Sequence, residues 1–469
     1  MKRKLLIFLG ALFILSLPVA IATGAFFWRF KAKIPTADYP EPASSVEARL
    51  QDIDYLAKLP DVDQSFSGDE RKMFTTHIER LKDTAADMSQ AQFNLAVAKA
   101  AAISENGHTN LHRVDLLDGL TSLPIRFFWF GDGLYIVRTR DTYAHLLGAK
   151  VLAYEGEEPG ALITRLDPYF GGNEAFLRFN SPTFLSSPEI MQSVGLAKSA
   201  DSATLILQLP DLSEDTLILP VEADSTPPIS PDDAPLSRTL TRETDSGNSW
   251  AFLPAETFTI AHYGRLPETI HWTDNLPGNG FYIRLRLILD QDDISLSKWF
   301  TALAEELKAK PVNYLVIDVR STFGGDYTKA RAFARGVKDY VIPDGNIYLL
   351  TDGGTFSAAI VAHAFALEAG GDQAIVVGTE IGDDAQFWAE GGAMLKLPNS
   401  GHRIWVTTGY HDWESGCNDW SKCFWLNIVM GVAAGPLGPD IIAPMTFADY
   451  SKGIDTTMLA VYKAEDITP

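Results

Sequence analysis

Ser357 stands where a hydroxyl can act as a nucleophile. It follows an apolar, β-branched run at 346–351 that predicts a buried strand, and an Asp-Gly-Gly break at 352–354. Directly after it, residues 358–369 form a strong helix pattern that two glycines close. Backbone N–H groups at such a helix start are unpaired, so they can stabilise the oxyanion formed when the hydroxyl attacks a carbonyl carbon. The alternative is that Ser357 only caps the helix.

A nucleophilic serine needs a general base, which is usually a lysine or a histidine. The next lysine after Ser357 is Lys396, in a distant apolar run, and this argues against a Ser-Lys pair. Of the nine histidines, His108 stands in a Gly-His-Thr turn after a predicted helix, on the kind of loop that carries catalytic groups. A structural, hydrogen-bonded role for His108 is the alternative.

Two stretches are candidates for the N–H donors of an oxyanion hole. One is Ala358, directly after the serine. The other is the turn at Gly324 and Gly325, which follows a buried-strand pattern over 313–320. Two glycines let the backbone approach a ligand without interference from Cβ atoms. A plain strand-to-helix turn is the alternative for this second stretch.

The elements that must position these residues follow from hydrophobic periodicity. Apolar residues at three- and four-residue spacing, each time after a serine, predict helices at 45–59, 67–86 and 89–103. From residue 121 the pattern becomes strand-like and includes a hairpin. Beyond a stretch rich in Pro, Ser, Thr and Asp at 224–249, strands alternate with helices, which predicts an α/β layer with partly parallel strands.

These patterns divide the chain of 469 residues into five parts. The predicted parts are an N-terminal signal segment at 1–33, a linker and helical region at 34–120, a β-rich segment at 121–223, a linker at 224–249 and an α/β core at 250–469.

The charge of the chain limits its partners. The net charge is −21, which argues against binding to nucleic acid or to an anionic membrane surface. The N-terminus differs, because Met1-Lys-Arg-Lys4 precedes the mostly apolar run 5–28, a pattern typical of an export signal and long enough to span a bilayer. We favour an uncleaved anchor, since the chain stays apolar through Trp28, although Ala20-Ile-Ala22 fits a cleaved signal peptide. Either reading places the body outside the cytoplasmic membrane.

The chain has two cysteines, Cys417 and Cys423, which are close in sequence. In an oxidising compartment we expect them to form a disulfide. Without a neighbouring pair of histidines they make a poor zinc site. We expect no metal and no cofactor, and the oligomeric state is left open.

Short motifs over residues 100–460 resemble, in the same order, those of the serine peptidases related to C-terminal-processing (tail-specific) proteases and the tricorn protease core. Glu105-Asn-Gly-His-Thr109 is similar to the Asp-Gly-His-Thr turn of that family. Residues 315–325 resemble its Asp-Leu-Arg-x-Asn-x-Gly-Gly signature, and 355–359 its Thr-x-Ser-Ala nucleophile motif. Further short matches lie at 145–156 (a PDZ-like segment), 281–284, 376–378 and 438–440.

The resemblance implies a multi-domain α/β fold. Its Clp protease/crotonase-like β-α-β core would follow a helical region and a PDZ-like β-rich segment, which would pair with an extended peptide by strand addition. Ser357 would be the nucleophile, and Gly324 or Gly325, with Ala358, would form the oxyanion hole. Two departures are Asn106 in place of Asp in the histidine turn and Thr322-Phe323 in place of Asn-Gly.

The family divides into Ser-Lys members and tricorn-like members that use Ser, His and Glu. Gly382 stands where the lysine would be, so the tricorn-like branch fits better, with His108 as general base. The third catalytic residue would be a carboxylate well downstream of the serine. Glu414 is our first choice, and Asp412 and Glu380 are rivals.

The sequence therefore predicts a serine endopeptidase or C-terminal-processing peptidase that acts on proteins or peptides. The main alternative is a catalytically inactive peptide-binding protein of the cell envelope on the same fold. An acyl-CoA enzyme of the crotonase type would share the Gly-Gly oxyanion architecture but would not need Ser357. A structural cell-envelope module predicts no phenotype for Ser357→Ala.

Overall fold

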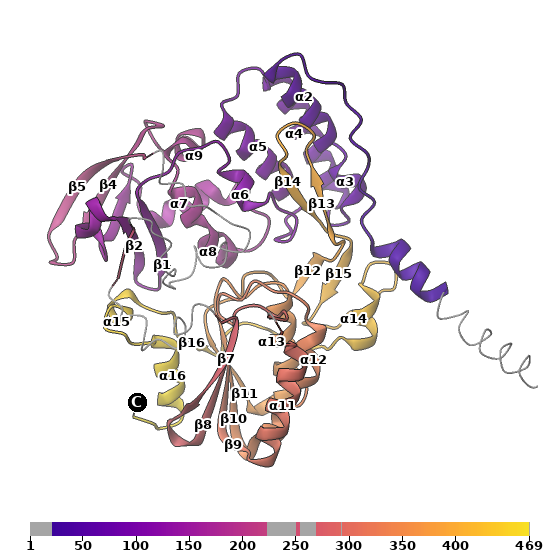
Figure 1. Cartoon of the computed structure of the whole chain (residues 1–469), viewed down its shortest axis with the longest axis vertical. Coiled ribbons are helices and arrows are strands. Elements are labelled where there is room, and N and C mark those ends of the chain that lie inside the picture. The colour runs from indigo at the N-terminus through magenta and orange to yellow at the C-terminus, as the bar shows by residue number, and fades with distance from the viewer. Residues whose placement is uncertain (1–20, 223–249, 254–268, 292, 469) are drawn as a thin grey trace, which may run out of the picture.

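The computed structural model describes residues 21–222, 250–253, 269–291 and 293–468. Helices and an antiparallel sheet make up the N-terminal region, which we define as residues 34–222. A second, mostly parallel sheet with helices on both faces makes up the α/β core, residues 269–468 (Figure 1). The predicted fold class, a multi-domain α/β protein, is confirmed.

The helices of the N-terminal region begin at serines because a serine side chain can accept a hydrogen bond from an otherwise unpaired backbone N–H. Ser44, Ser67 and Ser89 each cap a helix in this way. Glu70 and Gln92 complete a capping box with the second and third serines. The helices are α2 (Ser45–Leu56), α3 (Leu59–Val62), α4 (Gly68–Thr84), α5 (Gln90–Ala102) and α6 (Arg113–Leu116).

The predicted β-rich segment forms an antiparallel sheet in the order β1-β2-β3-β4-β5, with β6 paired to β2. The strands are β1 (Ile125–Phe130), β2 (Gly133–Arg140), β3 (Lys150–Tyr154), β4 (Ser202–Gln208), β5 (Glu214–Pro220) and β6 (Trp250–Phe252). Between β2 and β4 lie η1 (Asp141–Leu146), α7 (Pro159–Leu166), η2 (Asp167–Tyr169), α8 (Glu174–Leu185) and α9 (Pro188–Ser193). Strand β6 thus belongs to this sheet, although the sequence pattern groups residues 250–469 with the core.

The sheet of the α/β core has the order β16-β11-β10-β9-β8-β7, and only the β7–β8 pair is antiparallel. The strands are β7 (His271–Leu276), β8 (Gly280–Leu285), β9 (Val312–Asp318), β10 (Val341–Thr351), β11 (Ala374–Gly378) and β16 (Ile441–Ile442). Helices cover both faces, which explains why the strands read as continuous apolar runs. On one face pack α11 (Leu296–Ala309), α12 (Thr328–Ala334) and α13 (Ala358–Gly370), and on the other α16 (Thr456–Ala464) (Figure 1).

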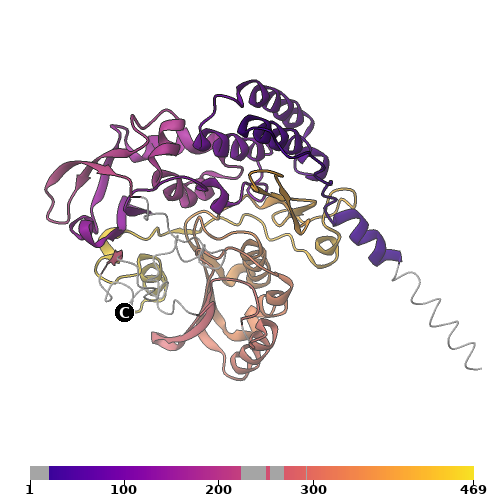
Figure 2. The same ribbon diagram turned by 45° about the horizontal axis from the view of Figure 1, so that its top comes forward.

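A hairpin from the core reaches into the N-terminal region. It consists of β13 (Ala393–Lys396) and β14 (Arg403–Val406), and its Leu395 and Ile404 are fully buried in the apolar core of that region. Both views place the hairpin beside the N-terminal helices (Figures 1 and 2). His402 Nε2 lies 2.8 Å from Asn94 Oδ1 on α5. The hairpin therefore fixes the helical region, and with it the Gly-His-Thr turn, relative to the core.

The remaining elements of the core connect these strands and helices. They are the paired strands β12 (Gln386–Ala389) and β15 (Gly409–Asp412), the helices α14 (Trp425–Met430) and α15 (Phe447–Tyr450), and the short η5 (Pro277–Asn279), η6 (Val337–Tyr340) and η7 (Gly371–Gln373). Helix α15 packs against β1 and β2 of the N-terminal region. Cys417 and Cys423 form a disulfide, as expected from the sequence.

Two predicted segments fall outside the described residues. They are most of the N-terminal signal segment, over 1–20, and the linker at 224–249. Within the described ranges, no helix combines the length and the apolar character that a bilayer crossing requires.

His363 makes the stability of the core dependent on pH. It lies fully buried on α13, where burial lowers its pKa to about 4 despite a contact of its Nε2 with the carbonyl oxygen of Leu437. The folded pKa lies below the ordinary value of 6.5, so this stability is present above pH 6.5 and is lost as the pH falls toward 4. We expect His363→Gln to reduce the loss of unfolding free energy between pH 7 and pH 4 by about 3 kcal/mol. Urea unfolding at both pH values measures it.

The matched control for this prediction is His145→Gln, because His145 is exposed. Its pH dependence should follow that of the unaltered protein. An unchanged pH dependence in His363→Gln would contradict the assignment of the acid-sensitive stability to His363.

Candidate active site

Ser357 occupies a strained position between β10 and α13. Its φ of 56° and ψ of −124° belong to a region that glycine adopts readily and that costs other residues about 1–3 kcal/mol. Its side chain makes no capping hydrogen bond. The alternative that Ser357 serves as a capping side chain is therefore wrong.

Gly324 lies directly against the serine. Its φ is +110°, and a Cβ atom built there would lie 2.7 Å from Ser357 Cβ and 3.2 Å from the nitrogen of Ala358. No other residue fits this approach. Gly325, with a φ of +132°, packs on the carbonyl of Ile288 and lines the same cavity as Ser357. The structure thus brings the predicted oxyanion residues to the serine.

Hydrogen bonds join the turn before Gly324 to the turn before Ser357. Asp352 accepts from the backbone N–H of Ser321 at 2.6 Å and from its hydroxyl at 2.9 Å. It also accepts from Gly354 N–H at 2.8 Å. The N–H of Phe356 donates to the carbonyl of Thr322 at 3.0 Å. Burial raises the pKa of Asp352, and these donors oppose that rise. The two turns therefore form one unit.

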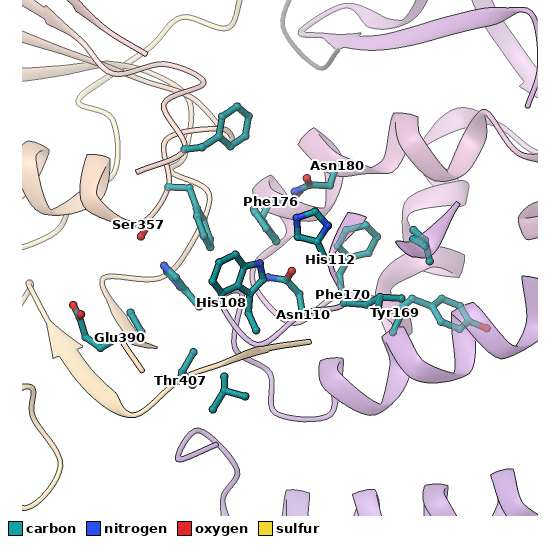
Figure 3. A pocket seen from close by; sticks show the side chains of 18 of the residues that line it. His108, Asn110, His112, Tyr169, Phe170, Phe176, Asn180, Ser357, Glu390 and Thr407 are labelled. Atoms are coloured by element: carbon teal, nitrogen blue, oxygen red, sulfur yellow. The ribbon is translucent and has the colours of Figure 1, made fainter. Parts of the chain in front are cut away.

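His108 reaches this unit from the N-terminal region. Its Nδ1 lies 3.2 Å from Oδ2 of Asp383, and both side chains are largely buried. Its Nε2 is buried and has no hydrogen-bond partner among the described residues. Figure 3 shows a ring nitrogen of His108 directed toward Ser357, and both residues line one cavity. Nε2 is therefore open toward the cavity that Ser357 also lines.

Aromatic rings hold the imidazole in this orientation. The ring of Phe356, next to the serine, stacks on His108 with centroids 4.2 Å apart. The ring of Phe387 stacks on its other face at 4.8 Å. Because the rings clamp both faces, the imidazole keeps one edge toward Asp383 and the other toward the cavity.

The carboxylate beside His108 is Asp383, and the prediction of Glu414 is corrected accordingly. Glu414 accepts a hydrogen bond from Gln386 Nε2 at 3.1 Å, and Asp412 accepts from Ser415 N–H at 2.8 Å. Glu380 packs against Gly438 instead. None of the three is paired with His108.

A signal for Asp383 was present in the sequence. It directly follows Gly382, the position where the resemblance led us to look for a lysine. In the structure this position lies beside the site, since a Cβ atom built on Gly107 would lie 2.9 Å from Asp383 Oδ2. A carboxylate there can orient a histidine, just as a lysine there could serve as a base.

A buried acid, Asp63, holds the Gly-His-Thr turn in place through hydrogen bonds, and the sequence did not predict it. Asp63 accepts from the hydroxyl of Thr109 at 2.9 Å and from Thr407 N–H at 2.7 Å. Asn106 donates to the Thr109 hydroxyl at 2.9 Å and accepts from Trp388 N–H at 3.1 Å. An ionised aspartate at 106 could not donate this hydrogen bond to Thr109, whereas the amide of Asn106 can.

The serine and the histidine open onto a cavity of about 520 Å³. Large aromatic side chains form much of the rest of its wall (Figure 3). They are Tyr169, Phe170, Phe176, Phe184 and Trp405. Within the described part of the chain, no cluster of three His, Cys, Asp or Glu residues is arranged to hold a metal.

Comparisons with known proteins establish the fold. No family model matches the chain, and no curated protein matches it. A solved structure of mature CPAF in complex with lactacystin aligns with 90% of this chain and 98% of its own, with a TM-score of 0.52. The chain has the fold of mature CPAF. A second structure of mature CPAF gives a TM-score of 0.51 over 90% of this chain and 97% of its own.

Sequence identity to both CPAF structures is 14%, so this likeness shows the fold alone. The photosystem II D1 C-terminal processing protease aligns with 83% of this chain and 99% of its own, with a TM-score of 0.34 and 13% identity. The tricorn-like branch stays a prediction.

The strained backbone at Ser357 predicts an order of stability among its variants. Ser357→Gly relieves the strain but increases the entropy of the unfolded chain, whereas Ser357→Ala keeps the strain. We expect the glycine variant to have an unfolding free energy about 1 kcal/mol above that of the alanine variant. Denaturant unfolding of the two variants measures this, and equal stabilities would contradict the strain.

Proposed function

We propose that the chain is a serine peptidase in which Ser357 attacks the peptide bond and His108 is the general base. The observation that carries the proposal is how the two ring nitrogens of His108 are placed. Its Nδ1 is tied to Asp383, and its buried Nε2 has no partner among the described residues and faces the cavity that Ser357 lines. An imidazole that a carboxylate orients through one nitrogen, and whose other nitrogen is open to the cavity, can act as a base toward a hydroxyl in that cavity.

In the proposed reaction, Nε2 of His108 takes the hydroxyl proton as Ser357 Oγ attacks the carbonyl carbon. The N–H of Ala358 and the backbone at Gly324 and Gly325 stabilise the oxyanion, and each donor is worth roughly 10²–10³ in rate. His108 then protonates the leaving amine. Water attacks the acyl-enzyme as His108 takes its proton, and His108 then returns that proton to Ser357 Oγ as the acid leaves, which restores Ser357.

Asp383 holds the histidine for both steps. As the hydrogen-bond acceptor of Nδ1–H, it favours the tautomer whose Nε2 is free, and it stabilises the imidazolium that forms.

Two further observations support a peptide substrate. Mature CPAF, which shares the fold, is a protease. The aromatic wall of the cavity can take up a large apolar side chain beside the scissile bond. Whether the peptidase acts within a chain or near its C-terminus, and whether the β1–β5 sheet binds peptide, stays part of the proposal.

Labelling with a fluorophosphonate probe tests the nucleophile. The folded protein should be labelled on Ser357, and Ser357→Ala should abolish labelling without loss of fold. Asp383→Asn should lower the rate of labelling and of peptide cleavage by roughly 10³–10⁴. Glu414→Gln is the matched control and should keep nearly full activity, because Glu414 is paired with Gln386 rather than with His108.

Folded protein that neither reacts with the probe nor cleaves any peptide would overturn the proposal. It would favour the catalytically inactive peptide-binding protein instead. Equal losses in Asp383→Asn and Glu414→Gln would overturn the role of Asp383.

We also propose that the chain is exported and stays attached to a membrane through its N-terminal segment. Supporting this, residues 21–30 are helical and lie against the loop that the disulfide closes, where Arg29 donates to the carbonyl of Ser421 at 2.7 Å. Trp28 and Trp420 remain 70% and 59% exposed there. Exposed tryptophans near basic side chains are typical of a membrane–water interface.

Cell fractionation tests this location. The full chain should remain in the membrane pellet after an alkaline wash, and Cys417 and Cys423 should react with a maleimide only after reduction. Recovery from the cytoplasm with both thiols free would contradict the proposal.

A further inference from the structure

Glu390 occupies an unusual position at the rim of the catalytic cavity. It follows β12 and precedes Gly391 and Gly392, and its φ is +64°. Glycine would adopt this backbone at a lower cost, yet a glutamate stands there. Glu390 lines the same cavity as Ser357 and His108, on the side away from the aromatic wall (Figure 3).

The carboxylate of Glu390 sets the charge of the cavity. Among the described residues that line it, Glu390 is the one acidic residue, and none is a lysine or an arginine. Its ion-pair contact within the described ranges is with Nε2 of His411, at 3.4 Å. Whether this contact cancels the charge depends on the protonation of His411.

A chain of hydrogen bonds keeps His411 neutral. The hydroxyl of Tyr327 donates to Oδ1 of Asn427 at 2.7 Å. The amide of Asn427 therefore presents its Nδ2–H to Nδ1 of His411, 2.9 Å away. Nδ1 must accept, so the single ring proton lies on Nε2, opposite Glu390. Burial also lowers the pKa of His411, although Glu390 opposes the shift. A neutral ring can orient the carboxylate but does not cancel its charge.

We propose that Glu390 forms a subsite that binds a basic side chain, arginine or lysine, adjacent to the scissile bond. This inference rests on the proposed peptidase function and names the substrate class of that site. The guanidinium of arginine fits best, because it can donate two parallel hydrogen bonds to a carboxylate. The acidic net charge of −21 would also attract basic peptides.

The test uses paired peptides that carry a single arginine, or citrulline as its neutral isostere, at successive positions on either side of the scissile bond. At one position, the unaltered protein should cleave the arginine peptide with a kcat/KM about 10- to 100-fold above that of the citrulline peptide. Glu390→Gln should abolish this preference and leave cleavage of the citrulline peptide unchanged. Glu390→Lys should prefer a glutamate at that position.

Glu368→Gln is the matched control. Glu368 lies on the same helix that Ser357 precedes, and it forms an exposed ion pair with Arg335 outside the cavity. This variant should keep the full preference for arginine.

Binding separates this inference from the proposed function. The affinity of Ser357→Ala for the arginine and citrulline peptides can be measured by calorimetry without any cleavage. Equal affinities, together with equal cleavage by the unaltered protein, would overturn the subsite while leaving the peptidase intact. An equal loss of kcat for both peptides in Glu390→Gln would also overturn it, since that would make Glu390 a positioning residue for the histidines. A preference for arginine in binding, without labelling of Ser357, would overturn the peptidase and keep the subsite.

Discussion

Arg320 joins two buried carboxylates close to the turn that carries Gly324 and Gly325. Its guanidinium donates to Asp318 at the end of β9 and, at 2.9 Å, to Asp455, the N-cap of α16. Burial alone would raise the pKa of Asp318, but the charges of Arg320 and Arg284 lower it to about 2. Loss of any one partner would leave a buried charge unpaired, at a cost of about 3–5 kcal/mol. The backbone leading to Gly324 is therefore fixed by a helix near the far end of the chain.

The histidine depends on a second constraint, the stack of rings that crosses from the N-terminal region into the core. Phe176 stacks on Phe356 at 4.6 Å, and beyond His108 the ring of Phe387 stacks on His411 at 4.8 Å. The five rings come from α8, the serine turn, the Gly-His-Thr turn, β12 and β15. The stack includes both His108 and Phe356, the neighbour of Ser357. The position of His108 relative to Ser357 therefore depends on how the N-terminal region packs against the core.

Local patterns predicted the parts of the site that lie close together in sequence. A strand, a glycine break and a helix located Ser357, and two glycines after a strand located Gly324. Contacts between distant segments were not predictable in the same way. Asp383 was not predicted because it lies one residue after Gly382, where the resemblance pointed to a lysine, and because its partner His108 is distant in sequence. Asp63 was not predicted because its hydrogen bonds join it to Thr109 and to Thr407, which is far along the chain. Helices α7 to α9 were missed because they lie in a segment where strand signals dominate.

The β13–β14 hairpin has a consequence for how such a chain can evolve. Its Leu395 and Ile404 fill the apolar interior of the N-terminal region, although they come after Ser357 in the chain. A recombination event that exchanged only the first or only the last part of the gene would separate the hairpin from the interior that it fills. The N-terminal region would then contain a cavity, and the core would carry an exposed apolar hairpin. The packing therefore favours exchange of the two regions together over exchange of either one alone.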